Sequence, residues 1–432
     1  MRLRTTVVTA GFSVLAVCLL PSLTAAQEVI DLPERDQPLT IGQEEFFSVG
    51  AIDGEEWETF SGIDGVSFDA DGNLYILDGN NFRVVKVGPR GDLIAEMGRA
   101  GEGPGEFGMP IGMSVTRAGE VRAYDMAQQR FTVFNPDGTF KSNARVEGVS
   151  SNFFLPNGGL MSLPDGTMVD GGKSPRRLQV MASGGDTDPL APRPVNLVTI
   201  GEDTEISSAF QAWNPLTAVG EQDEQVFSGG GIQMSGAPMR AFDAELFVGA
   251  FPDGRIAVAD STTYTIKIVQ PGQGVARVLR RPFTPREVTR RDQADERERE
   301  LARIAERTGS GGGGRAYSPD GSGRSVAISA GGASDFLRTR VESMEFGQEM
   351  PILADMTVDW DGRIWTERTG RRVGEKGPID LITVDGRYLG SVDPDECRIP
   401  DAFGPDGLAA FIERDELDVP RIVVKRLSIL TR

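Results

Sequence analysis

Hydrophobic and polar residues alternate along most of the chain in short runs that end at glycine-containing turns. The clearest unit covers residues 69–98, where apolar side chains recur at every second position. Asp71-Gly72 and Arg90-Gly91 are typical of tight hairpin turns, because glycine adopts positive φ without steric cost. The pattern predicts antiparallel strands at residues 62–68, 73–77, 83–87 and 93–97.

The unit repeats at a regular spacing. The glycines of the first turn, Gly72, Gly119 and Gly166, are 47 residues apart, and a second turn glycine follows 19 residues later in each unit. Four short antiparallel strands in about 45 residues are typical of a propeller blade. The loops are too short for the helical crossovers of a parallel sheet. Further turn signals occur at Gly254, Gly362 and Gly407. We therefore predict an all-β fold, a six-bladed β-propeller formed by residues 27–432.

The sixth unit lacks one strand. Its sequence predicts strands only near residues 408–412 and 421–427, whereas residues 45–49 form a strand-like segment ahead of the first unit. We predict that residues 45–49 complete the last blade and close the ring, because closure removes the sheet edges that favour aggregation.

Two insertions interrupt the repeat. Residues 201–244 contain Trp213, Phe227 and three consecutive glycines and match no regular element. Residues 285–346, between the fourth and fifth blades, form a helical and flexible insertion. Its start, Thr284-Pro285-Arg286-Glu287, is typical of a capping box with proline at the first helical position. A polar helix follows, which is either solvated or a lid over one propeller face.

The rest of the second insertion divides into a polar and an apolar part. Residues 308–325 are rich in glycine and serine and cannot bury enough apolar surface to order themselves. After them comes a helical stripe that we expect to pack the insertion on the propeller. The stripe consists of Phe336, Leu337, Val341 and Met344.

One stretch of the chain resembles a known family. The link GRAGEGPGEFGMPIG at residues 98–112, the strand end YILD and the following NNFRVVKV resemble the NHL-repeat group of six-bladed β-propellers in exported bacterial proteins. The resemblance covers residues 45–140, 245–275 and 350–390. It implies binding and interaction scaffolds for most members and metal-dependent hydrolases or lyases for a minority, so it implies the fold and selects no activity.

The first 26 residues are typical of a secretory signal peptide. Two arginines precede an apolar run at residues 7–20, and small residues precede Gln27. We predict cleavage after Ala26 and a secreted or periplasmic protein. Lipidation at Cys18 is the alternative, which the bulky residue before it disfavours. No other segment is apolar over the length that a membrane span needs. After cleavage Cys397 is the only cysteine, so no intramolecular disulfide is expected.

The composition narrows the possible chemistry. The chain has 64 acidic and 45 basic residues, a formal charge of −19 and no histidine. This charge disfavours binding to nucleic acid or to anionic membranes. Without an imidazole, Ser-His-Asp and Cys-His nucleophile systems and histidine-ligated zinc are excluded. We expect a monomer whose partner is an unknown small molecule or protein.

Several acidic residues recur in the repeat and are interpreted as structural. Residues 69–73 and 359–362 resemble the start of calcium loops but lack the glutamate at the twelfth position. Tight hairpins need the same residue types, so we interpret both as turns. Asp78, Asp125 and Asp260 end the second strand of three blades. Their repetition favours a hydrogen bond within each blade.

Acidic residues that break the repeat are the candidates for function. Four lie on or near the innermost strands, which line the channel: Asp64, Asp355, Glu245 and Asp401. In calcium-dependent gluconolactonase-like propellers, carboxylates on such strands hold an axial metal. However, Asp64 stands eight positions before its turn glycine and Asp355 seven. Alternation would point them to opposite faces unless a bulge intervenes.

Three functions are therefore compatible with the sequence. The leading interpretation is an exported propeller that binds a ligand or protein through the loops and insertion of one face, without catalysis. Under it the four acids are binding candidates at the channel mouth, with no catalytic residue, no metal ligand and no cofactor. The alternative is a calcium-dependent gluconolactonase-like hydrolase with an axial metal. The third is an envelope interaction module with a stable protein partner.

Overall fold

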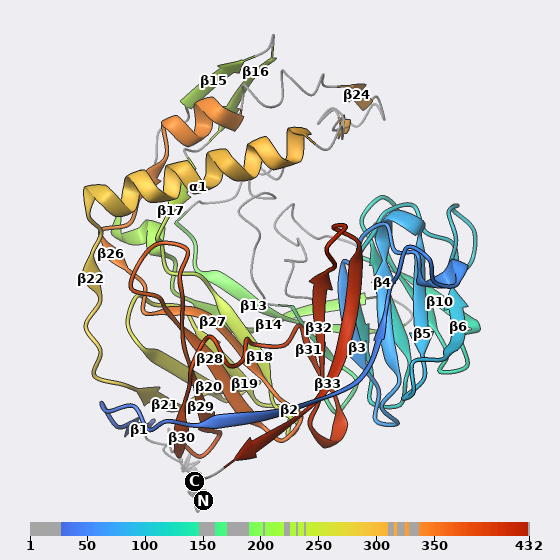
Figure 1. Ribbon diagram of the computed structural model, residues 1–432, viewed down its shortest axis with the longest axis horizontal. Helices are drawn as coiled ribbons and strands as arrows, with labels where there is room; N and C mark the ends of the chain where they lie inside the picture. Colours follow the sequence, from blue (N-terminus) through green and yellow to red (C-terminus); the bar gives the residue numbers. More distant parts are fainter. Residues whose placement is uncertain are drawn as a thin grey trace, which may run out of the picture.

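The fold was obtained as a computed structural model, and its sheets confirm the predicted six-bladed β-propeller (Figure 1). The predicted signal peptide, residues 1–26, lies outside the described residues. The structure describes residues 27–146, 160–170, 190–201, 204–219, 225–229, 232–236, 239–309, 315–317, 325–327 and 337–430.

Each blade contains an antiparallel sheet whose first strand in the chain lies innermost. Blade 1 consists of β3 (Gly65–Phe68), β4 (Leu74–Asp78), β5 (Arg83–Val87) and β6 (Leu93–Met97). Blade 2 consists of β7 (Pro110–Val115), β8 (Val121–Asp125), β9 (Arg130–Phe134) and β10 (Phe140–Arg145). Blade 3 consists of β11 (Met161–Ser162), β12 (Met168–Asp170), β13 (Arg193–Ile200) and β14 (Thr204–Ala212).

Two of the remaining three blades, blades 4 and 6, include a strand from the N-terminal region. Blade 4 consists of β18 (Phe247–Ala250), β19 (Ile256–Ala259), β20 (Thr265–Gln270), β21 (Gly274–Arg280) and β1 (Glu28–Asp31). Blade 5 consists of β27 (Leu353–Val358), β28 (Arg363–Thr369), β29 (Lys376–Thr383) and β30 (Tyr388–Val392). Blade 6 consists of β31 (Ala402–Phe403), β32 (Leu408–Arg414), β33 (Pro420–Leu430) and β2 (Thr40–Val49).

The turn between the first and second strand has a glycine of positive φ in every blade, although in blade 6 the preceding Asp406 is left-handed as well, with φ of 53°. Its glycine takes φ between 76° and 87°, a conformation that disfavours residues with a Cβ. The six glycines are those on which the repeat was counted: Gly72, Gly119, Gly166, Gly254, Gly362 and Gly407.

The alternation of apolar residues follows from burial of both faces of each blade. In β4, Leu74 and Ile76 are fully buried against blade 6, whereas Tyr75 and Leu77 face blade 2. Six hydrophobic clusters fill the interfaces between the six pairs of neighbouring blades. A core occupies every interface, so the ring is closed.

The N-terminal segment, residues 28–49, follows the outer strands of three blades in succession, and we call it the belt. β1 pairs in parallel with β21 of blade 4. Leu39 N then donates to Ser391 O of blade 5 at 2.9 Å. β2 pairs with β33 and forms the outer strand of blade 6. The strand expected at residues 45–49 is thus part of β2, whereas the parallel strand on blade 4 had no counterpart in the sequence analysis. In Figure 1 the belt is the blue segment along the lower edge.

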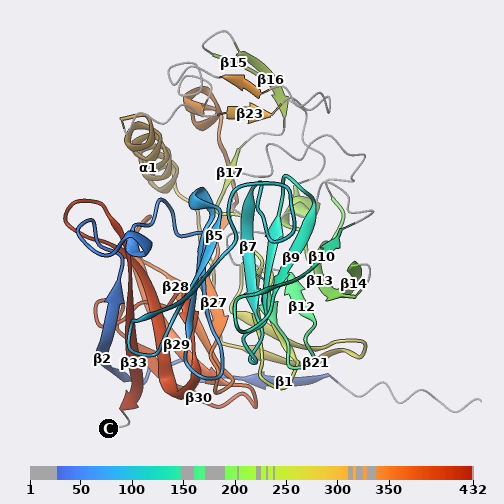
Figure 2. The same ribbon diagram turned by 90° about the vertical axis from the view of Figure 1, so that its right-hand side faces the viewer.

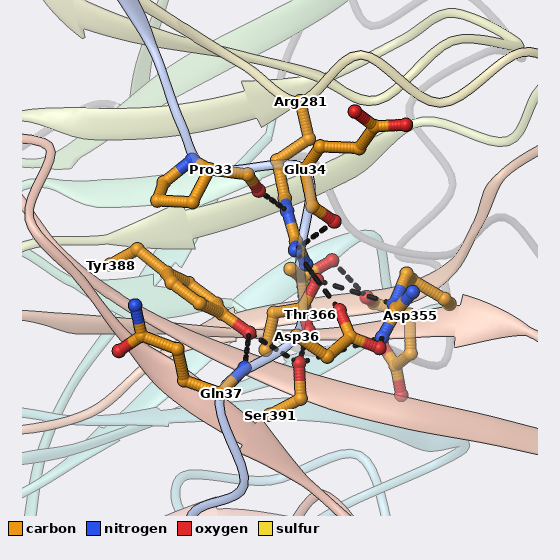
Figure 3. A network of polar contacts seen from close by, with 11 residues as sticks. Pro33, Glu34, Asp36, Gln37, Arg281, Asp355, Thr366, Tyr388 and Ser391 are labelled. Carbon is orange, nitrogen blue, oxygen red and sulfur yellow. Dashed lines mark hydrogen bonds and ion pairs between the residues drawn. The ribbon is translucent and has the colours of Figure 1, made fainter.

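A buried arginine joins the belt to blades 4 and 5 (Figure 3). Arg281 follows β21, and its side chain is inaccessible to solvent. It donates to Asp380 of β29 at 2.8 Å and to Asp36 of the belt at 3.0 Å. It also donates to the carbonyls of Pro33 and Glu34, at 2.8 and 3.1 Å. Burial alone would lower the pKa of Arg281, but Asp380 raises it above its ordinary value.

The third blade differs from its prediction. The second turn expected at Gly185 lies outside the described residues. The third strand is β13, and β14 occupies residues 204–212, which were expected to belong to an insertion. These residues pair with β13 and are not an irregular loop. The connection to blade 4 therefore begins only after Ala212.

The polar helix begins later than predicted. Arg286 and Glu287 form β22 (Arg286–Glu287), which pairs with β26 (Glu349–Met350), so the expected capping box at Thr284 does not form. Instead α1 (Arg290–Gly309) is capped by Thr289. The Thr289 hydroxyl accepts from Asp292 N at 3.2 Å, and the Asp292 carboxylate accepts from Thr289 N at 2.9 Å.

The two insertions share a small core of their own. Buried Val341 and Met344 contact Ala241 and Ile304, and β17 (Arg240–Ala241) pairs with β25 (Glu345–Phe346). The apolar stripe therefore packs one insertion on the other, not on the barrel as expected, because its apolar partners lie on α1 and β17. Phe336 lies outside the described residues.

The insertions gather on one side of the propeller, with α1 and β17 above the blades in both views (Figures 1 and 2). The structure describes two further hairpins in them, β15 (Gln225–Gly229) with β16 (Ile232–Gly236), and β23 (Arg315–Tyr317) with β24 (Ser325–Ala327). Short 3-10 helices are η1 (Glu56–Glu58), η2 (Gly79–Asn81), η3 (Pro215–Ala218) and η4 (Pro405–Gly407). Over the described residues, none of the helices has the length and apolar character that a membrane span requires.

Candidate functional site

A channel of about 390 Å³ passes between the innermost strands of the six blades. Strands β3, β7, β11, β18, β27 and β31 all contribute to its wall. These strands run in the same direction, so the channel has two different ends. We call the end where they begin the mouth, because β17 and β26 of the insertions lead into it. We call the other end, formed by the glycine turns, the turn end.

Three of the four candidate acids line this channel: Asp64, Asp355 and Asp401. All three lie at the start of an innermost strand and hence at the mouth. The pairing of β27 with β28 shifts between Leu353 and Asp355 and is regular from Asp355 to Val358, so this bulge precedes Asp355 and leaves its register to the turn unchanged. Asp64 and Asp355 thus stand one position apart in register, and both line the channel, an outcome that alternation alone did not predict.

Asp64 is the channel acid whose charge is least compensated. Its Oδ2 accepts from Gly79 N at 3.0 Å. Among the described residues, no lysine or arginine forms an ion pair with it. Burial raises its pKa, the hydrogen bond from Gly79 opposes this, and the nearby charge of Asp78 raises it further. A half-buried carboxylate without a counter-ion favours a cationic or hydrogen-bond-donating ligand.

The other two acids have partners within the chain. Asp401 Oδ2 accepts from Arg398 Nη1 at 2.8 Å and from Ile412 N at 2.7 Å. Asp355 Oδ1 accepts from Met356 N at 2.7 Å. Arg398 also lines the channel, so the mouth contains one cation beside its three acids.

Glu245 lies outside the channel wall. It is exposed and precedes β18 by two residues, and its charge acts on Arg193 of blade 3. Arg193 donates to the carbonyls of Trp213, Ala244 and Asp260, at 2.8, 2.9 and 3.2 Å. Its burial lowers its pKa to about 10, and Asp260 is the main charge opposing this. Through these hydrogen bonds Arg193 stabilises the connection between blades 3 and 4.

The mouth does not present a ligand set for calcium. Within the described part of the chain, no group of three or more acidic or cysteine side chains lies close enough together to hold a metal ion. Asp64, Asp355 and Asp401 come from blades 1, 5 and 6 and are spread around the wall. Calcium takes six to eight oxygens in proteins, so these residues do not fit the axial metal that the alternative function requires.

The turn end carries a feature that the sequence analysis missed. The Arg117 guanidinium of blade 2 lies over the Trp360 ring of blade 5, with 4.6 Å between Cζ and the ring centroid. Both residues line the channel. The sequence held a signal for this pair, because both stand two residues before a turn glycine, where the other four blades have alanine or proline.

The repeated acids are structural, as predicted. Asp359 Oδ1 accepts from Asp361 N at 3.0 Å and from Arg363 N at 2.8 Å, which is the hydrogen bonding of a turn. Asp78, Asp125 and Asp260 are fully buried. Each accepts a hydrogen bond from the backbone of the preceding connection, at Ser61, Met109 and Trp213 respectively.

A buried acid in blade 3 occupies a position that is apolar in blade 1. Asp170 of β12 corresponds to the core residue Ile76 of β4, four residues after the turn glycine. Burial raises its pKa to about 6, and a hydrogen bond from the Asn196 side chain opposes this. The folded state therefore holds this proton to a higher pH than the unfolded chain.

We expect Asp170→Asn to stabilise the protein at neutral pH. The rise of the Asp170 pKa from 3.8 to about 6 on folding corresponds to at most about 3 kcal/mol in the free energy of unfolding. The wild type loses this stability as the pH increases through that interval. In urea unfolding at pH 4, 5, 6 and 7.5, the free energy of unfolding of the variant should exceed that of the wild type by an amount that grows with pH. The control Asp53→Asn removes an exposed carboxylate and should unfold with the same free energy as the wild type. A gap for Asp170→Asn that is constant with pH would contradict the assignment.

The sequence matches no protein-family model and no curated protein. Solved structures of similar fold include a protein described as exported from Bacteroides fragilis, 13% identical, which covers 93% of this chain and 99% of its own with a TM-score of 0.45. A gluconolactonase from Xanthomonas campestris is 12% identical over 92% of this chain and 97% of its own, at 0.38. Virginiamycin B lyase from Staphylococcus aureus is 11% identical over 89% and 99%, also at 0.38. Similarity of this degree carries no substrate or reaction over to this chain.

Proposed function

We propose that the protein is an exported propeller that binds a ligand at the channel mouth, beneath the insertions, without catalysing a reaction. The observation that carries the proposal is the single channel of about 390 Å³, in which Asp64 lacks a cationic partner among the described residues. This volume is within the range of small-molecule sites. The absence of histidine from the sequence supports a binding role over acid-base catalysis.

Export rests on the signal-peptide pattern of residues 1–26. Membership of the NHL-repeat group rests on residues 98–112 and the strand pattern before them. Both are supported by the sequence alone. Gel electrophoresis of the periplasmic and culture fractions of an expressing host, with N-terminal sequencing, should reveal a chain that begins at Gln27. A chain that keeps residues 1–26 in every fraction would contradict export.

The binding proposal is tested by filling the channel. Ser67 of β3 lines the wall, so Ser67→Phe should occupy the space of a ligand. Asn143→Phe, on the exposed face of β10, adds the same ring outside the channel. The purified proteins are incubated with small-molecule and envelope-protein fractions of the native host, and retained species are identified by mass spectrometry. We expect a species retained by the wild type and by Asn143→Phe and reduced at least about tenfold by Ser67→Phe.

Two outcomes would overturn this proposal. Equal retention by both phenylalanine variants would place binding outside the channel. Turnover of lactone or ester substrates by the wild type that Asp64→Asn abolishes would replace a binding role with a catalytic one. A melting curve for each variant distinguishes loss of the ligand from loss of the fold.

We expect Asp64→Asn to separate binding from stability. The asparagine oxygen still accepts from Gly79 N, while the half-buried charge beside Asp78 is removed. Retention of a cationic ligand should therefore fall, and the stability at pH 7 should stay equal or rise within about 1 kcal/mol. Because the pKa of Asp64 is raised, wild-type binding should also weaken as the pH falls through that raised pKa. A variant that binds like the wild type would exclude Asp64 from the site.

The competing proposal is the calcium-dependent gluconolactonase-like hydrolase. The presence of Asp355 and Asp64 on the same channel wall favours it. The lack of a three-ligand group among the described residues speaks against it. Calorimetric titration of the dialysed protein with calcium decides between them. Binding that Asp64→Asn and Asp355→Asn both abolish would support the hydrolase, and no effect of calcium on melting would remove it.

A further inference from the structure

The six turns at the turn end place one equivalent residue each around the channel axis. These residues stand two positions before the turn glycines, whose φ values are nearly equal, and only in blade 6 does the residue between them, Asp406, also have positive φ. Four of them are alanine or proline, and the exceptions are an arginine and a tryptophan. The six are Ala70, Arg117, Pro164, Pro252, Trp360 and Pro405.

The two exceptional residues meet across the axis. Blades 2 and 5 are three blades apart in a ring of six, so they face each other over the channel. The Arg117 guanidinium and the Trp360 ring stack with 4.6 Å between Cζ and centroid. This cation–π contact holds the guanidinium over the ring, and it uses none of the N–H donors of the guanidinium.

The charge of Arg117 is not compensated by a carboxylate within the described residues. The two acids in the turn of Trp360, Asp359 and Asp361, both pair with Arg363. Asp359 has further partners. Its oxygens accept from Arg363 Nε at 2.7 Å and from Trp365 Nε1 at 2.9 Å, besides the backbone of its own turn. A guanidinium without a partner in a protein with a charge of −19 is available to an anion from outside the chain.

Polar and apolar side chains share the wall beside Arg117. Val358 stands at the end of β27 and lines the channel at this level, whereas Phe68 and Phe251, each 2% exposed, are packed into the interfaces between blades. The acids at the mouth would repel a second negative charge on a ligand that extends toward them. The site therefore fits a ligand with one carboxylate, whose body contacts Trp360 and Val358.

We propose that Arg117, stacked on Trp360, binds the carboxylate of a small monocarboxylic acid whose apolar body occupies the channel. This inference deepens the proposed function and rests on it, since the ligand lies in the same channel. The guanidinium donates two parallel hydrogen bonds to the carboxylate, and Trp360 and Val358 contact the apolar body. A cationic group on the same ligand would reach Asp64 at the mouth.

Benzoate is the probe for this site, with benzamide as its neutral analogue and terephthalate as the dianion. In calorimetric titrations of the full mature chain, we expect benzoate to bind at least tenfold more tightly than either analogue. Arg117→Met should weaken benzoate at least tenfold. Arg117→Lys keeps the charge but not the planar pair of donors, so it should retain part of the affinity.

Arg255→Met is the matched control. Arg255 also lies over an aromatic ring of a first turn, Phe251 at 5.8 Å, but it already pairs with Asp253. This variant should leave benzoate affinity unchanged. Melting curves show whether Arg117→Met keeps the fold, and Trp360→Leu is the second variant if it does not, with the same tenfold loss expected.

Three results would overturn the inference: equal affinity of wild type and Arg117→Met, equal affinity for benzamide, or no binding of benzoate by the wild type. These results are distinct from failure of the proposed function. If Ser67→Phe loses a host species that the wild type retains, but the wild type does not bind benzoate, only the carboxylate site is rejected. If benzoate binds in a manner that depends on Arg117, but Ser67→Phe retains every host species, only the proposed binding of a host ligand is rejected.

Discussion

A chain that begins at Gly50 is expected not to form the closed ring. It lacks the outer strand of blade 6, which pairs with β33 from Thr40 to Val49. It also loses Leu39, Ile41 and Val49, each at most 6% exposed, from the clusters on both sides of that blade. Burial of one such side chain contributes about 1.5–3 kcal/mol, and a native protein is stable by only about 5–15 kcal/mol.

The matched control is a chain that begins at Leu32. It lacks only β1, and blade 4 keeps four antiparallel strands without it. We expect this shorter truncation to unfold cooperatively at a somewhat lower urea concentration, and the longer one to aggregate through the exposed edge of β33. Gel filtration and circular dichroism measure both. A chain from Gly50 that elutes as a compact species and melts like the full mature protein would show that β2 does not close the ring.

Replacing Arg281 with methionine is expected to lower the free energy of unfolding by about 3 kcal/mol. The variant leaves Asp380, which is fully buried, without its main cation, and it frees the belt carbonyls of Pro33 and Glu34. Arg368 Nε remains 3.3 Å from Asp380, so the loss falls at the lower end of the range for a broken buried ion pair. Urea unfolding of the mature chain measures the change.

The neighbouring Arg280 supplies the control. Its ion pair with Asp31 is half-exposed, so Arg280→Met should cost less than about 1 kcal/mol. A double variant, Arg281→Met with Asp380→Leu, removes both charges and should recover most of the loss. Equal costs for Arg280→Met and Arg281→Met would show that the buried network does not hold the belt.

The number of blades could be predicted because it is encoded locally. Alternation over a few residues specifies a strand buried on both faces, as Tyr75 and Ile76 show in β4. The turn glycine, which follows an aspartate in five of the six units, specifies the turn, since φ is positive at Gly72 and its five equivalents. The roles of Asp78 and Asp359 followed from the same repetition. Such signals involve only neighbouring residues, so they can be recognised in a single sequence.

The site was predictable only in part. Asp64, Asp355 and Asp401 line the channel as expected, because the first strand of each blade is innermost. The position of Glu245 beside Arg193 was not predictable, since it depends on how the connection from blade 3 folds back. The stack of Arg117 on Trp360 joins residues 243 positions apart, and the repeat reveals their equivalence but not their contact.

The sequence by itself determined the strands, the turns, the count of six blades and which acids repeat, because each depends on backbone conformation within one hairpin. Only the tertiary structure decided that Asp64 and Asp355 share one channel wall, that α1 starts at Arg290 and that β1 pairs in parallel with blade 4. A competing local arrangement existed in each case, such as the capping box at Thr284. Contacts between distant segments selected one of them, because closing the ring buries more surface than any local preference can offset.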